Sequence, residues 1–107
     1  MVASVTGRNI RLSAWTWRKI QDDHLEFRDR QELTDEIRKA IVDPDYVVAG
    51  RRGARIALSW SEAAPVGAKH LAVVYRELNG DGFVITAFFI SRFERLLRRG
   101  ILWQKSS

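Results

Sequence analysis

Two histidines are the residues of this chain best suited to acid–base chemistry. His24 and His70 are the only histidines in the 107 residues, and histidine transfers protons readily near neutral pH. His24 follows Trp17 and Ile20 at helical spacing, so it is a candidate proton-transfer group. The structural alternative is a helix-end histidine that caps carbonyls or pairs with a nearby acid. His70 is either a second functional group or an exposed residue at a strand end.

A single hydroxyl interrupts an apolar segment. Thr86 is the only polar residue between Phe83 and Ile90. A strand this apolar is expected to be central, with both faces largely covered, so the hydroxyl needs a partner or faces a pocket. The alternative is a β-branched strand residue that bonds to a neighbour. Thr86 is therefore a candidate for contact with a substrate.

Two groups of arginines are candidates for contact with phosphate. Arg51, Arg52 and Arg55 lie at a predicted turn and at the start of the strand that follows it. A guanidinium pairs bidentately with phosphate and stabilises negative charge in a transition state. A second set at helical spacing, Arg92, Arg95, Arg98 and Arg99, predicts a basic outer helix face. For both groups the alternative is a solvated surface that maintains solubility.

The distribution of charge favours a polyanionic partner. The net charge is +5. Residues 22–46 carry nine acidic and four basic groups, whereas residues 47–107 carry ten basic and four acidic groups. An arginine-rich basic surface of this kind suits nucleic acid.

Composition excludes several classes of protein. A hydrophobic content of 46% is too high for intrinsic disorder. The absence of Cys excludes disulfides and thiolate metal sites, and two isolated histidines do not form a zinc motif, so no metal or cofactor is expected. No stretch approaches the roughly 20 apolar residues that cross a bilayer. Residues 1–12 lack the apolar run of a secretory signal, so we expect a cytoplasmic protein.

Periodicity predicts two helices followed by strands. The first helix begins after Ser13 as N-cap and ends near His24; the second runs from about residue 29 or 30 to 42 and is stopped by Pro44. Strands are predicted at 46–49, 55–60, 70–78 and 83–90, and a short helix at 92–99. We therefore expect one α+β domain (residues 1–107, core about 13–103). Its N-terminal helices should pack on one face of a four-stranded antiparallel sheet, with a short C-terminal helix.

Together these features resemble phage and prophage members of the barnase–EndoU–colicin–RelE-like nuclease group. The resemblance covers roughly residues 15–103. It is carried by the order of elements, by His24, by Asp43-Pro44-Asp45 after the second helix, and by the strands at 71–75 and 84–88. It implies metal-independent cleavage of RNA, in which the 2′-hydroxyl attacks the phosphorus and leaves a cyclic phosphate.

The resemblance also implies roles for particular residues. His24 matches the histidine of the helical half, Thr86 a threonine or serine late in the sheet, and Arg55, or else Arg51, a basic residue of the earlier strands. His24 would take the proton of the 2′-hydroxyl or protonate the leaving 5′-oxygen. Arg55 would neutralise the phosphorane, and Thr86 would donate to a phosphate oxygen or hold a catalytic side chain. RNA would be bound by Arg51, Arg52, Trp60, His70 and Arg92, with Trp60 stacking on a base. A second catalytic residue near the C-terminus has no clear match; Ser91 and Arg92 are the nearest candidates.

Three classes of function are compatible with these features of the sequence. The first is a ribonuclease, such as a toxin or mobile-element effector, with RNA such as tRNA as substrate and an acidic inhibitor protein as partner. The second is a non-catalytic nucleic-acid-binding domain, which predicts salt-sensitive binding without product. The third is a homodimeric interaction module that binds no nucleic acid. The charge and the hydrophobic periodicity of the sequence do not distinguish a ribonuclease from a non-catalytic nucleic-acid-binding domain.

Overall fold

The computed structural model describes residues 1–65 and 67–106. The helices are α1 (Ala14–Asp23), α2 (Leu33–Val42) and α3 (Glu94–Leu97), with short 3₁₀ turns η1 (Leu25–Phe27) and η2 (Arg51–Gly53). The strands are β1 (Val2–Ala3), β2 (Asn9–Arg11), β3 (Tyr46–Ala49), β4 (Arg55–Trp60), β5 (His70–Arg76), β6 (Gly82–Ile90) and β7 (Ile101–Gln104). None of the helices in this part of the chain is long and apolar enough to cross a membrane.

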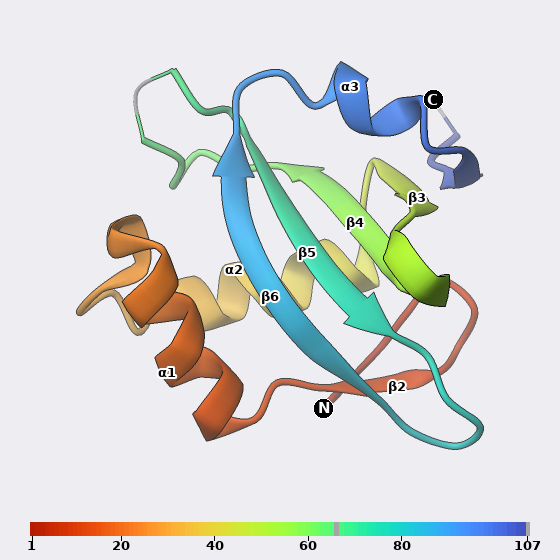
Figure 1. The fold of residues 1–107 in the computed structure, drawn as a ribbon, viewed down its shortest axis with the longest axis horizontal. Coiled ribbons are helices and arrows are strands. Elements are labelled where there is room, and N and C mark those ends of the chain that lie inside the picture. The colour runs from red at the N-terminus through yellow and green to blue at the C-terminus, as the bar shows by residue number, and fades with distance from the viewer. Residues whose placement is uncertain (66, 107) are drawn as a thin grey trace.

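The strands form one mixed sheet in the order β1-β2-β6-β5-β4-β3-β7. Figure 1 labels its inner strands, from β2 to β3. Strands β3 to β6 are the predicted antiparallel meander. The prediction of a four-stranded antiparallel sheet is nevertheless wrong, because β2 joins β6 in parallel and β7 adds to β3 at the other side. The three extra strands are two to four residues long. Segments this short carry no alternating pattern, so only pairing with a neighbouring strand defines them.

Local sequence accounts for most element boundaries. The Ser13 hydroxyl accepts the backbone N–H of Thr16 at 3.0 Å, so Ser13 is the N-cap that was predicted for α1. Strands β3 and β4 have the predicted bounds. Helix α2 begins at Leu33, later than predicted, and Asp29, the first predicted position, has a positive φ of 58° that is incompatible with a helix.

Both long helices pack on one face of the sheet, as predicted, and in Figure 1 α2 passes behind the strands. We call this the helix-covered face. Its core joins helical residues such as Ile20, Phe27 and Ile37 to strand residues such as Val73 and Tyr75. Ile10 of β2 belongs to the same core, so the core begins upstream of the predicted boundary at residue 13.

The opposite face, which we call the open face, has a thinner cover. Its buried residues are Val48, Ile56, Leu58 and Ala72, and it is partly covered by Phe93, Leu96 and Leu97 of the α3 region. These three residues pack against that cluster. The expectation that β6 is covered on both faces holds only for the helix-covered face, because α3 is one turn long and leaves much of the sheet uncovered.

Candidate functional site

The open face is hollowed into a cavity of about 480 Å³, which we call the arginine trough. Its volume lies within the ~300–1,000 Å³ typical of ligand sites. Apolar side chains of three strands and α3 contribute to its lining: Ile56, Val74, Ile85, Phe88 and Leu96. Four arginines contribute the charge: Arg51, Arg52, Arg76 and Arg99. The trough therefore joins an apolar surface to concentrated positive charge.

Backbone carbonyls hold two of these arginines in place. Arg76 Nη1 donates to the carbonyl oxygen of Arg52 at 2.7 Å, and Arg99 Nε donates to that of Ala49 at 3.0 Å. A guanidinium has five N–H donors, so each keeps most of them for a ligand.

The charge of the trough is not neutralised within the protein. Over residues 1–65 and 67–106, none of the four arginines forms an ion pair, and no carboxylate is among the trough-lining residues. Anionic ligands such as phosphate are therefore favoured here.

The turn that carries Arg51 and Arg52 is strained. Arg52 has φ 53° and ψ 40°, in the left-handed region that costs a non-glycine residue about 1 kcal/mol. A Cβ at Gly50 would lie 3.1 Å from the carbonyl oxygen of Ala54, so the turn closes tightly. Strain of this kind is common at functional sites. Here it sets two arginines beside the trough.

Two of the three predicted catalytic residues lie close to Phe88, although neither is among the trough-lining residues. His24 follows the last residue of α1, and its ring centroid lies 6.1 Å from that of Phe88, which lines the trough. Thr86 pairs with Val74 in the sheet, so its half-buried side chain lies on the open face. Thr86 and Phe88 are two positions apart on one face of β6, about 7 Å along the strand. His24 and Thr86 are therefore each close to Phe88.

The third, Arg55, lies elsewhere. It pairs with Tyr75 in the sheet, so its side chain projects from the helix-covered face. There its Nε forms an ion pair with Glu77 Oε1 at 3.1 Å, and the Thr6 hydroxyl donates to the other carboxylate oxygen. The Glu77 side chain is only 11% exposed. Arg55 and Thr86 thus point to opposite sides of the sheet, and the structure does not bring them together.

A buried tyrosine lies beside this ion pair. Tyr75 is fully buried, and its hydroxyl finds no hydrogen-bond partner in the described part of the chain. Burial raises the pKa of Tyr75 to about 12, and the negative charge of Glu77 adds to the rise while Arg55 opposes it. This cluster ties the N-terminal segment to the sheet and is separate from the trough.

The residues predicted to bind RNA fall into three places. Arg51 and Arg52 line the trough. Arg92 is exposed just before α3 and is not among the trough-lining residues. Trp60 and His70 pair at the far end of β4 and β5, with ring centroids 5.6 Å apart and nearly perpendicular.

Sequence reasoning did not assign Arg76 or Phe88 to the site. For Arg76 a pattern was available, because it lies at alternate positions from Ala72 and Val74 in a predicted strand and so shares their face. Phe88 lies in a segment that is apolar except for Thr86, and the sequence marks none of its apolar residues as exposed.

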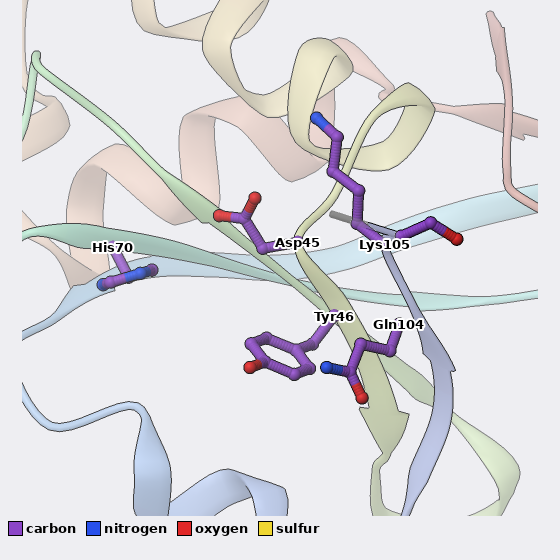
Figure 2. Close-up of a pocket in the computed structure, with 6 residues that line it drawn as sticks. Asp45, Tyr46, His70, Gln104 and Lys105 are labelled. Atoms are coloured by element: carbon purple, nitrogen blue, oxygen red, sulfur yellow. The ribbon is translucent and has the colours of Figure 1, made fainter.

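A second cavity of about 350 Å³ lies near β7 (Figure 2). Its lining residues are Asp45, Tyr46, His70, Gln104, Lys105 and Ser106. Among residues 1–65 and 67–106, no group of three or more His, Asp or Glu side chains is arranged to hold a metal ion.

The comparisons with known proteins return nothing: no family model, no curated protein and no solved structure matches this chain.

Proposed function

We propose that this chain is a metal-independent endoribonuclease that binds RNA in the arginine trough and cleaves it beside Phe88. The observation that supports the proposal is the position of His24, whose ring lies against Phe88 at the wall of the trough. A proton-transfer group therefore lies next to an aromatic residue that lines the same trough as a set of uncompensated arginines. RNA such as tRNA is the proposed substrate class.

Binding would rest on phosphate contacts. Free N–H donors of Arg52, Arg76 and Arg99 pair with phosphate oxygens. This electrostatic contribution to RNA affinity becomes weaker as the salt concentration rises. The apolar lining covers ribose and base surfaces, with Phe88 as the aromatic element. The same uncompensated arginines are the surface that an acidic inhibitor protein would cover.

Cleavage would proceed by attack of the ribose 2′-oxygen on the adjacent phosphorus. His24 accepts the proton of the 2′-hydroxyl, the bond from phosphorus to the 5′-oxygen breaks, and that oxygen takes a proton from water. The products are a 2′,3′-cyclic phosphate and a 5′-hydroxyl. The Thr86 hydroxyl donates to a non-bridging oxygen, and Arg76 offsets the charge on the phosphorane. Arg76 thereby takes the role that the resemblance implied for Arg55.

The test is incubation of the purified protein with total tRNA and with a single-stranded RNA in EDTA. We expect fragments that end in cyclic phosphate. His24→Gln should slow cleavage by about 10²-fold or more, since general acid–base catalysis contributes ~10²–10⁴-fold. Thr86→Val removes the hydroxyl at nearly constant shape and should lower the rate with little change in binding. Arg38→Gln, which alters an arginine paired with Asp35 on α2, is the matched control.

The second candidate function is nucleic-acid binding without cleavage. The separation of Arg55 from Thr86 favours it, because the full catalytic set that the resemblance implies is not assembled on one face. It predicts salt-sensitive binding that depends on Arg76 but not on the imidazole of His24. Intact RNA at protein in excess over substrate, together with such binding, would select this function over the nuclease.

A further inference from the structure

Strand β7 is an edge of the sheet that carries apolar side chains. It pairs with β3 on one side, and no strand of the described residues pairs with its other side. Ile101 and Leu102 are 48% and 49% exposed, and Trp103 is half-buried. The strand contains no charged residue and no proline, which are the residues that commonly protect an edge from pairing with another chain. The outer side of β7 is therefore available to a further strand.

The pairing with β3 determines which backbone groups lie on the outer side of β7. The N–H of Lys105 donates to the carbonyl oxygen of Asp45 at 3.0 Å, so the backbone groups of Lys105 face β3. Backbone groups alternate in direction along an antiparallel strand, so Trp103 also faces β3, whereas Leu102 and Gln104 direct their N–H and C=O outward. Two donors and two acceptors are thus presented along the outer side of the strand.

A second copy of β7 satisfies all of these groups in one antiparallel register. When Leu102 of one copy lies opposite Gln104 of the other, the two-fold axis repeats that pair, so every outward donor meets an outward acceptor. The same register places Trp103 opposite Trp103 of the other copy. That position is not hydrogen-bonded across the interface, and side chains approach most closely at such positions. The strand is therefore complementary to itself, both in its hydrogen bonds and in its apolar side chains.

The charges at the two ends of β7 favour the same orientation. Arg98 and Arg99 precede the strand, and neither forms an ion pair within residues 1–65 and 67–106. At the other end, Asp43 pairs with Lys105 at 3.1 Å, and Asp45 follows Asp43 by two residues. In an antiparallel pair the beginning of one strand lies beside the end of the other. The two arginines of each copy therefore come next to the two carboxylates of its partner, where opposite charges attract.

We propose that this chain forms a two-fold symmetric dimer in which β7 of each copy pairs antiparallel with β7 of the other. The sheet then continues from one copy into the next. The two-fold axis is perpendicular to the sheet, so both open faces, each with its arginine trough, lie on the same side of the dimer. Two short strands make a small contact, so we expect a dissociation constant on the order of 10 μM. The dimer does not depend on the proposed function, because it is argued from β7 and its ends alone.

Sedimentation velocity of the full chain without RNA tests the dimer. Between about 1 and about 300 μM protein, the chain should pass from monomer to dimer. Leu102→Lys places a cation in the middle of the interface and should raise the dissociation constant by about tenfold or more. The matched control is Leu25→Lys, at a leucine that is 66% exposed in η1 beside β6, and it should leave dimerisation unchanged. A chain that stays monomeric throughout, or equal weakening by both lysines, would overturn the proposal.

An exchange of charges tests the orientation of the two strands. Arg98→Glu places a carboxylate beside Asp43 of the other copy, and Asp43→Arg places two cations together, so each variant alone should dimerise about tenfold more weakly. In an equal mixture of the two variants both contacts join opposite charges, so mixed dimers should form about as tightly as the unchanged chain. A mixture as weak as its components, or no weakening by either variant, would overturn the antiparallel dimer. These outcomes are the same whether or not the chain cleaves RNA.

Discussion

The Arg76 guanidinium, at the end of β5, donates to the carbonyl oxygen of Arg52 at 2.7 Å. This bond connects a strand to the strained turn η2 and brings two arginines to one side of the trough. Arg52 itself is held in the left-handed conformation. The position of Arg52 in the turn thus depends on the side chain of Arg76, which lies 24 residues later in the chain.

Replacement of Arg76 tests that dependence. Arg76→Gln should weaken RNA binding by about tenfold and lower the slope of log K against log salt by about one, because one phosphate contact is lost. Binding is measured by fluorescence anisotropy with labelled single-stranded RNA at several salt concentrations. Arg38→Gln removes an equal charge from α2 and should change the slope little. An equal effect of both variants would mean that net charge, and not the trough, determines binding.

The Arg52→Gly substitution should lower RNA affinity without lowering the stability of the fold. Glycine adopts positive φ without strain, which favours the folded state by about 1 kcal/mol, although its greater freedom when unfolded offsets part of this gain. The free energy of unfolding in urea should therefore stay level or rise by up to ~1 kcal/mol. RNA affinity should fall in the same variant. A clear loss of stability would show that the Arg52 side chain supports the turn.

The Arg55→Ala substitution should lower the stability of the fold and leave RNA binding and cleavage unchanged. Removing Arg55 leaves Glu77, only 11% exposed, without its cation beside Tyr75. We expect a loss of about 1–3 kcal/mol in the free energy of unfolding, since a nearly buried charge loses its partner. RNA affinity and cleavage rate per folded molecule should persist at a temperature where the variant is folded. Loss of cleavage without loss of stability would instead support the catalytic role that the resemblance implied.

Tyr75 should make the protein sensitive to alkali. Its pKa rises to about 12 on folding, chiefly because burial disfavours the anion and also because Glu77 is negative. A group whose pKa is higher in the folded state stabilises that state below its unfolded pKa of about 10 and loses this effect as pH climbs to about 12. Stability should therefore fall across that window. Tyr75→Phe should flatten the decline, as followed by thermal unfolding from pH 9 to 12.

The elements with a strong local pattern were predictable from the sequence. Three of these patterns each involve fewer than a dozen neighbouring residues. They are the Ser13 N-cap, the amphipathic face of α2 and the alternation of side chains in β4. The antiparallel meander followed from the short turns between consecutive strands. Strands β1, β2 and β7 were missed, since each exists only through hydrogen bonds to a strand distant in sequence.

The sequence by itself determined the α+β class, the basic arginine-rich surface, and the presence of His24 and Thr86 as candidates for chemistry. Only the tertiary structure decided which of these residues meet. Side chains alternate between the two faces of a sheet, so the register of β4, β5 and β6 sends Arg55 to the helix-covered face and Thr86 to the open face. The same register places Arg76 beside Arg52, because strand pairing joins positions that no local pattern relates.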